Sequence, residues 1–261
     1  MGDVLETLLL FAAVGFLAQI VDGALGMAYG VISSSVLMAF GVPPAAASAT
    51  IHVAEVFTTG ASAVSHAANR NVTWRLFWPL MIAGVIGGAS GAYLLTQIDG
   101  ERIKPFISAY LACIGLYILY RAVRGIKPRE VPTLAAPPLG LVGGFLDAIG
   151  GGGWGPMVTS TLVGAGKDPR RAIGTVNTAE FFVTVAISAA FVGALLTGHW
   201  KGTVFQQQAW AVGGLIGGGL LAAPLAGFVV KIVPARWLQW GVGLLILGLS
   251  AWQLSQALLK R

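Results

Sequence analysis

The sequence predicts an all-α polytopic membrane protein made of two inverted-topology repeats, each with about five helical elements and a broken or re-entrant glycine-rich helix. Three observations predict it: a composition poor in charge, recurring apolar stretches of membrane-spanning length, and an internal repeat. The chain has 261 residues, of which 56% are hydrophobic and only 10% charged, and its mean hydropathy is +0.80. Because a soluble domain carries about 25% charged residues, this composition favours a lipid environment.

Apolar stretches recur along the whole chain. A bilayer core of about 30 Å requires roughly 20 apolar residues in a helix, and several stretches are long enough. They cover residues 4–21, 45–68, 76–96, 103–120, 172–197, 204–230 and 238–258. The first stretch has the acidic start MGDVLE and no basic n-region, so we expect a retained membrane helix rather than a signal peptide.

Net charge and cysteine content narrow the classes of function. The net charge is +6, but basic residues of a membrane protein mostly report loop orientation, so we expect no nucleic-acid partner. The single cysteine, Cys113, cannot form an internal disulfide or a multi-cysteine metal site. We interpret it as a small residue that packs between helices.

The sequence contains an internal repeat: DGALGMAYG, from Asp22, recurs without gaps as DAIGGGGWG, from Asp147. The matched pairs are Asp22 and Asp147, Gly26 and Gly151, Gly30 and Gly155, Ser35 and Ser160, Gly41 and Gly166, Pro44 and Pro169, Thr50 and Thr175, and Glu55 and Glu180; Tyr29 aligns with Trp154 and His52 with Asn177. Such self-similarity predicts two homologous halves. We expect a first repeat over 1–124, a proline-rich cytoplasmic linker over 125–138 and a second repeat over 139–261.

Each half should contain five helical elements, taken here in chain order. In the first half they cover about 4–21, 24–40, 45–68, 75–97 and 103–124. In the second half they cover about 134–149, 152–165, 171–197, 203–231 and 235–259. The second element of each half is short and rich in glycine, so its pattern leaves open whether it crosses the membrane completely.

An odd number of crossings per half would place the second half upside down, and loop charges test this expectation. Alternating loops assign five basic residues to one side, namely Arg102, Lys104, Lys201, Lys260 and Arg261. The other side receives eleven, namely Arg70, Arg75, Arg121, Arg124, Lys127, Arg129, Lys167, Arg170, Arg171, Lys231 and Arg236. The positive-inside rule makes the second side cytoplasmic and predicts that both termini are non-cytoplasmic.

Inverted repeats with interrupted helices are typical of transporters, which bind substrate near the membrane midplane. The predicted breaks contain Gly26 and Gly30 in the first half and Gly151, Gly152 and Gly153 in the second. Their backbone amides, at the start of a helix, could bind an anion. The alternative is close packing of helices through small residues. Tyr29 and Trp154 follow the breaks and could line a cavity, and Ser34 supplies a hydroxyl group just beyond.

Asp22 and Asp147 stand at the start of the two breaks. Aspartate accepts hydrogen bonds from amides at helix N-termini, so a capping role is expected for both. A role in carrying protons stays open, because acidic side chains inside membranes are costly and are commonly functional.

The third element of each half carries the most specific polar pattern. TIHVAEVFTT places Thr50, His52, Glu55 and Thr59 close to one helical face, and TVNTAEFFVT repeats this with Thr175, Asn177, Glu180 and Thr184. Residues three or four apart are neighbours on a helix, so His52–Glu55 and Asn177–Glu180 can pair locally. We predict proton coupling at Glu55 and Glu180, whereas the alternative is a polar pair that only locks helix packing.

A metal site is not expected, because the repeat offers Asn177 where the first half has His52, and a catalytic zinc site needs about three good protein ligands. No cofactor is expected either. The repeat cores contain aspartate and glutamate but no lysine or arginine. A bound anion would therefore need protonated acids, backbone amides, or a loop residue such as Arg170 or Arg171 reaching inward.

These residues resemble the sulfite exporter TauE/SafE family, also called the four-toluene sulfonate uptake permeases. The resemblance covers both halves and lies in DGALGMAYG, the His52-x-x-Glu55 helix followed by SHAANRNV, DAIGGGGWGP and GTVNTAEFFVT. It implies a multi-pass carrier in the bacterial plasma membrane that moves sulfite, sulfonates or related sulfur-containing anions. No catalytic motif comes with it.

Together these features predict a secondary transporter that moves a small sulfur-containing anion, sulfite or an organosulfonate, by alternating access with protons as partners. The predicted substrate-binding residues are Gly26, Tyr29, Gly30, Ser34, Thr50, His52, Gly151, Gly152, Gly153, Trp154, Thr175 and Asn177. The predicted proton-coupling residues are Asp22, Glu55, Asp147 and Glu180. A passive anion channel is the alternative, and an intramembrane enzyme using His52 and Glu55 lacks a nucleophile.

Overall fold

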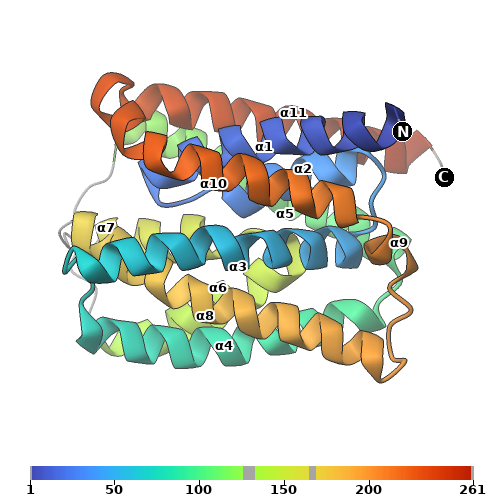
Figure 1. The fold of residues 1–261 in the computed structure, drawn as a ribbon, viewed down its shortest axis with the longest axis horizontal. Coiled ribbons are helices and arrows are strands. Elements are labelled where there is room, and N and C mark those ends of the chain that lie inside the picture. Colours follow the sequence, from blue (N-terminus) through green and yellow to red (C-terminus); the bar gives the residue numbers. More distant parts are fainter. Residues whose placement is uncertain (1, 126–132, 165–168, 260–261) are drawn as a thin grey trace.

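The computed structural model describes residues 2–125, 133–164 and 169–259, in which long helices run lengthwise side by side (Figure 1). The first half contains α1 (Gly2–Leu25), α2 (Tyr29–Ala39), α3 (Pro44–Ala68), α4 (Trp74–Gln97) and α5 (Gly100–Arg124). The second half contains the short 3-10 helix η1 (Thr133–Ala135), α6 (Ala136–Gly150), the π-helical turn η2 (Gly155–Thr159), α7 (Ser160–Gly164), α8 (Pro169–Leu196), α9 (Thr203–Gln206), α10 (Ala209–Ile232) and α11 (Ala235–Leu259). No strand occurs in these ranges.

Five helices are long and apolar enough to cross a membrane, within the part of the chain that the structure describes. They lie in α1, α4, α5, α8 and α11, and shorter apolar helices are α2, α6 and part of α10. The predicted all-α membrane fold is confirmed. Helix α3 is not among the five, because polar residues such as His52 and Glu55 interrupt its apolar sequence and are buried inside the bundle.

The most extensive helix contacts fit the predicted two-fold relation between the halves. Helix α1 packs on α10 and α6 packs on α4, while α3 meets α8 and α5 meets α11. If α1 corresponds to α6 and α4 corresponds to α10, the two-fold relation converts the contact between α1 and α10 into the contact between α6 and α4. It also relates α3 to α8 and α5 to α11, so each of these two contacts is converted into itself. Helix α1 begins and α11 ends at the same end of the bundle (Figure 1).

Glycines let the paired helices approach until backbones touch. A Cβ atom added to Gly15 of α1 would meet the carbonyl oxygen of Leu215 at 2.5 Å, and one added to Gly140 of α6 would meet that of Leu80 at 2.6 Å. Small residues allow such approach in membranes, where van der Waals packing replaces the hydrophobic effect between helices.

Helix boundaries lie close to the predicted ones, with two differences. Helix α1 continues to Leu25, so Asp22 lies in its last turn and not at the start of the second element. The predicted element 203–231 is divided into α9 and α10. Of the predicted linker 125–138, residues 126–132 lie outside the described residues, and so do Lys167, Lys260 and Arg261.

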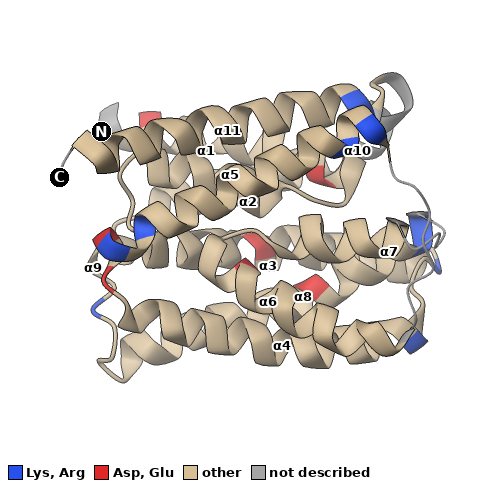
Figure 2. Cartoon of the chain, turned by 180° about the vertical axis from the view of Figure 1, so that it is seen from behind, with Lys and Arg blue, Asp and Glu red and all other residues tan. Residues whose placement is uncertain are grey.

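Basic residues gather mainly at one end of the bundle, as Figure 2 shows, while acidic residues appear near its middle and at the opposite end. Arg70 follows α3 and Arg75 begins α4 at one end, and Arg124 ends α5. Arg121 departs from the prediction that it is a loop charge: it lies within α5 and is only 7% exposed.

Candidate functional site

The two glycine-rich breaks have similar backbone geometry. Gly26 and its repeat partner Gly151 both have φ of +66°, in the left-handed region that glycine adopts without a steric penalty. Gly152 has φ of +155° and Ala28 has φ of +106°. These residues end α1 and α6 and turn the chain into the short helical segments that follow, so the predicted interruptions are present in both halves.

The two breaks also touch each other directly. A Cβ atom added to Gly30 would meet the carbonyl oxygen of Gly151 at 2.6 Å, and one added to Gly155 would meet Cα of Met27 at 2.7 Å. A Cβ atom on Gly152 would clash with the backbone of Gly30 and its neighbour Val31. Close packing through small residues therefore accounts for these glycines.

Asp147 satisfies the amides of the second break. Its carboxylate Oδ1 accepts hydrogen bonds from the amides of Gly153, at 2.7 Å, and Trp154, at 3.0 Å. Its backbone carbonyl accepts from the amides of Gly151 and Gly152. The amides of Gly151, Gly152 and Gly153, which the sequence suggested for anion binding, therefore already have an acceptor.

Asp22 makes the corresponding but looser contact in the first half. Its Oδ1 lies 3.4 Å from the amide of Tyr29, the first residue of α2. Both aspartates thus stand in the last turn of one helix and accept from the first turn of the next, which is a capping role carried across a break.

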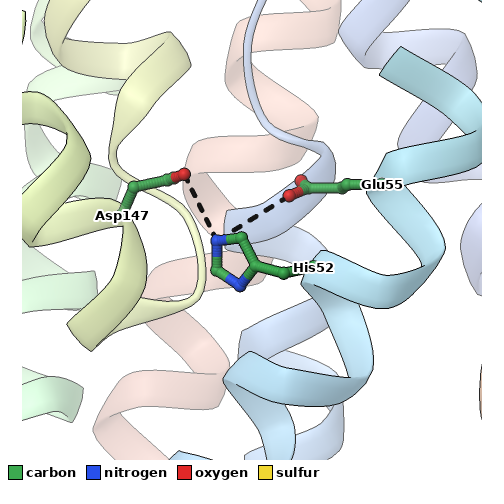
Figure 3. A group of neighbouring side chains, drawn as sticks. All are labelled: His52, Glu55 and Asp147. Carbon is green, nitrogen blue, oxygen red and sulfur yellow. Dashed lines mark hydrogen bonds and ion pairs between the residues drawn. The ribbon is translucent and has the colours of Figure 1, made fainter. Parts of the chain in front are cut away.

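His52 joins the two halves at the centre of the bundle (Figure 3). Its Nε2 lies 3.3 Å from Oδ2 of Asp147 on α6 and 4.0 Å from Oε2 of Glu55, one turn along α3. The predicted His52–Glu55 pairing is present, but Asp147 is the nearer partner. All three side chains are buried.

A hydrogen bond on the other side of the imidazole ring shows that Nδ1 carries a proton. Nδ1 of His52 lies 2.7 Å from the backbone carbonyl oxygen of Ser48, and a carbonyl oxygen only accepts, so Nδ1 donates. The hydroxyl group of Ser48 donates in turn to the carbonyl oxygen of Ala148, at 2.6 Å. Nε2 then faces Asp147 either as a donor or as an acceptor for a carboxylic acid. In both cases one proton lies between them.

Further carboxyl groups surround this pair. Asp22, Glu55 and Glu180 line a small chamber of about 10 Å³ together with Tyr29 and Asn177, and its remaining lining residues are Gln19, Thr58, Thr59 and Ser62. A cavity of roughly 10–15 Å³ by this measure holds one water molecule. The chamber is therefore a polar pocket with room for about one water molecule, too small in this state for a sulfur oxyanion.

A larger cavity of about 390 Å³ shares Gln19, Ser62 and Asn177 with the chamber. Its other lining residues are Gly23, Ala61, Ser65, His66, Ala223 and Pro224. We call this cavity the vestibule. Because Ser65 and His66 lie in the last turn of α3, the vestibule extends from Asn177, which also lines the chamber, to the end of the bundle where α3 ends.

Among the other predicted substrate-binding residues, several bond to the protein and line neither cavity. Trp154 is fully buried and its Nε1 donates to the carbonyl oxygen of Val176, at 3.2 Å. Ser34 donates to the carbonyl oxygen of Gly150, at 2.7 Å. Thr175 donates to the backbone carbonyl oxygen of Arg171 and accepts from the amide of Thr73, while the hydroxyl group of Thr50 is buried without a partner among the described residues.

Asn177 stands where the chamber and the vestibule meet. Its Nδ2 donates to Oγ of Ser62, at 3.2 Å, and its Oδ1 is buried with no partner in the described residues. The predicted local bond from Asn177 to Glu180 is replaced by this contact across the halves. A free acceptor at the junction of two cavities is available to a ligand, a water molecule or a proton donor.

A cation could also be held at the centre. One ligand atom each from His52, Glu55 and Asp147 lies within 4.8 Å of the others. All three were predicted as site residues from the sequence, but only His52 and Glu55 were expected to lie together, because Asp147 comes from the other half. The hydrogen bond between His52 and Asp147 explains the arrangement without an ion.

Four residues near the site, namely Gln19, Thr58, Ser62 and Arg121, were not predicted as site residues from the sequence, whereas Thr59 was placed on the face of Glu55. Gln19 precedes Asp22 by one turn on α1, and Thr58 and Ser62 follow Glu55 at helical spacing on α3, so face periodicity was the available signal. Thr59 donates to the backbone carbonyl of Glu55. Arg121 was signalled by its spacing from Leu111 and Ile118, which lie on the buried face of α5.

Comparison with known proteins agrees with this architecture. The family model described as sulfite exporter TauE/SafE matches residues 11–253. The probable membrane transporter protein YtnM of Bacillus subtilis is 44% identical over 234 residues, which cover 87% of this chain and 76% of the relative.

Two more distant relatives carry similar names. A probable membrane transporter protein of Haemophilus influenzae is 28% identical over 61% of this chain and 65% of its own length. The probable membrane transporter protein ORF9 of a Sinorhizobium species is 27% identical over 59% of this chain and 60% of its own. No solved structure matches the chain. The family match over nearly the whole length, on a helical membrane fold, shows that the chain belongs to the sulfite exporter TauE/SafE family of membrane transporters.

Proposed function

We propose that this protein is a secondary carrier that moves a small sulfur-containing anion, sulfite or an organosulfonate, together with protons across the bacterial plasma membrane. The observation that carries the proposal is the vestibule, which runs from one end of the bundle to Asn177, where it adjoins the small chamber lined by buried carboxyl side chains. The family description supports a sulfur-containing anion as the substrate.

Charge explains why protons should accompany the anion. Asp22, Glu55, Asp147 and Glu180 are all buried and interact with one another electrostatically. Two like charges about 4 Å apart repel by several kcal/mol at an effective dielectric constant of 20, and an incoming anion would add to this repulsion. Protonated carboxyl groups would instead donate hydrogen bonds to it.

The predicted inversion of the halves supplies a reason for alternating access. In the predicted orientation the end of α3 is cytoplasmic, so the vestibule opens to the cytoplasm in this state. Exchange of the two halves' conformations would close this vestibule and open an equivalent one on the other side. Asn177 and Glu180 in the second half would then take the places of His52 and Glu55. We propose no enzymatic role for these residues.

A flux assay in proteoliposomes tests the substrate and the coupling together. Sulfite, an alkylsulfonate, sulfate and thiosulfate are compared with and without an imposed pH gradient, and with sodium replaced by choline. We expect saturable flux of sulfite or the sulfonate that responds to the pH gradient and not to sodium. Flux that does not saturate with substrate concentration would indicate a passive channel. Loss of flux when choline replaces sodium would indicate that the carboxyl groups bind sodium and not protons.

Two substitutions identify the proton-coupling groups. Glu55→Gln and Glu180→Gln keep side-chain size but cannot exchange a proton, so each should flatten the pH dependence of flux. Glu101→Gln is the matched control, because Glu101 is exposed in the first turn of α5. Unchanged pH dependence in both core variants would remove the coupling proposal.

A further inference from the structure

Arg121 is a buried arginine in the last turn of α5, and the proposed function gives it no role. Only 7% of its surface is exposed. The guanidinium group stays protonated in proteins, so a full positive charge is held inside the helical bundle.

Neutral groups surround this charge. Nη1 donates to Oγ of Ser160, at the start of α7, and lies 3.5 Å from Sδ of Met27 in the first break. The ring of Tyr117 lies 5.9 Å from its Cζ. No ion pair is formed with a carboxylate of the described residues, and Nε is buried without a hydrogen-bond partner.

An arrangement of this kind is costly without an anion. A buried charge is normally paired, and charged residues inside membranes mark substrate or ion pathways. Arginine presents its N–H groups in a planar fork that matches two oxygens of one oxyanion. In the described residues, the hydrogen bonds that the guanidinium group donates all come from Nη1. The side of the group that carries the N–H of Nε is therefore available to an anion.

The surroundings of Arg121 supply further donors. Thr159 precedes Ser160, and its hydroxyl group is buried without a partner in the described residues. Thr159 also lies beside Gly26, since a Cβ atom on that glycine would meet its methyl group at 3.2 Å. The guanidinium group thus meets the hydroxyl group of Ser160, and the next residue in the chain, Thr159, carries a second hydroxyl group beside the first break.

We propose that Arg121, with Thr159 and Ser160, forms an oxyanion-binding site for the transported substrate. This inference rests on the proposed function and names the positive group that the carboxyl-lined cavity lacks. In the present state Ser160 takes the place of one anion oxygen at Nη1. An arriving sulfite or sulfonate group replaces that hydroxyl group and pairs with the Nε edge.

Replacement of Ser160 has a mechanical consequence. Arg121 now bridges Met27 in the first half and Ser160 in the second, so it holds the two broken segments to α5. An anion that takes the guanidinium group releases Ser160. Binding of substrate then loosens one segment relative to the other, which links occupancy of the site to conformational change.

The test compares Arg121→Gln with Arg124→Gln, an exposed arginine one turn further along α5. Full-length protein is purified in detergent, and its melting temperature is measured with sulfite, methanesulfonate or chloride at equal ionic strength. We expect the oxyanions to stabilise the wild type and R124Q but not R121Q. In proteoliposomes R121Q should raise the KM for sulfite more than about tenfold. Stabilisation of R121Q equal to that of the wild type would overturn the proposal.

A second variant keeps the test decisive if R121Q does not fold. Arg121→Lys retains the charge but not the fork, so KM should rise for sulfite and methanesulfonate while turnover at saturation changes less. An unchanged KM in R121K would overturn the proposal, because a structural tether needs no fork. Phosphate or nitrate, and not sulfur anions, could raise the melting temperature of the wild type, with R121Q losing that increase. This result would support the oxyanion site and contradict the proposed substrate.

Discussion

The imidazole of His52 and the carboxylate of Asp147 meet across the two halves of the protein, with Nε2 3.3 Å from Oδ2. The other oxygen of the same carboxylate accepts two amides of the second break. The side chain of Asp147 therefore has two roles: it shares a proton with His52, and it caps the helical segment that follows the break. Any change in the protonation of this pair alters the strength with which Asp147 holds the break.

Substitutions of Asp147 should separate these two roles. Asp147→Asn keeps an oxygen for the amides of Gly153 and Trp154 but loses the carboxyl proton, so it should fold and show a changed pH dependence of flux. Asp147→Ala leaves two buried amides without their acceptor, at about 1–3 kcal/mol each. Thermal unfolding of purified protein should rank wild type and D147N above D147A. Equal melting temperatures for D147N and D147A would contradict the capping role.

The contact between the two breaks predicts a steep penalty for a single methyl group. Gly152→Ala forces a left-handed φ on a residue with a side chain, which costs about 1–2 kcal/mol, and drives Cβ into the backbone of Gly30 and Val31. We expect loss of folded protein or a strongly lowered melting temperature. Gly248→Ala in α11 meets no atom within 4 Å and should be neutral. Similar yields of both variants would argue against the contact.

Asn177 should control passage between the vestibule and the chamber. Asn177→Leu replaces an amide at the junction with an apolar side chain of similar size, so flux should fall at least about tenfold while the protein stays folded. Val185→Leu on the exposed face of α8 is the control. Proteoliposome flux and size-exclusion profiles measure the outcome. Normal flux through N177L would place the pathway elsewhere.

Cysteine labelling should locate the mouth of the vestibule. In a Cys113→Ser background, Ser65→Cys should react with a charged, membrane-impermeant thiol reagent added from the cytoplasmic side only. Ser65 lines the vestibule, whereas its neighbour Val64 is exposed outside it and faces lipid in the predicted orientation. Val64→Cys should therefore react slowly from both sides. Labelling of S65C from the outside alone would reverse the predicted orientation.

Local patterns predicted most of the helices and both interruptions. Helices α3 and α4 begin and end within about two residues of the predicted bounds, because hydrophobic length and proline positions act locally. The repeat of Asp22 and Asp147 predicted their capping contacts. These features depend on neighbours in sequence, so a single sequence is enough to find them.

Contacts between distant segments could not be predicted in the same way. The sequence shows that His52 can pair with Glu55 one turn away, but its nearer partner lies 95 residues further on. It shows amide donors at Gly151–Gly153, but not that Asp147 already occupies them. It assigns Arg121 to a loop by charge, whereas the packing of α5 against the broken segments turns that side chain inward.

The backbone contact of Gly30 with Gly151 and Gly152 has a consequence for motion. Where two helical segments meet through side chains, changes of rotamer can accommodate small displacements. Where backbone atoms are in direct contact, no side chain lies between them to adjust. The broken segments therefore have no room to approach each other further, and a displacement of one segment at this contact requires a displacement of the other. In the alternating-access mechanism proposed above, this contact would couple the movements of the two halves.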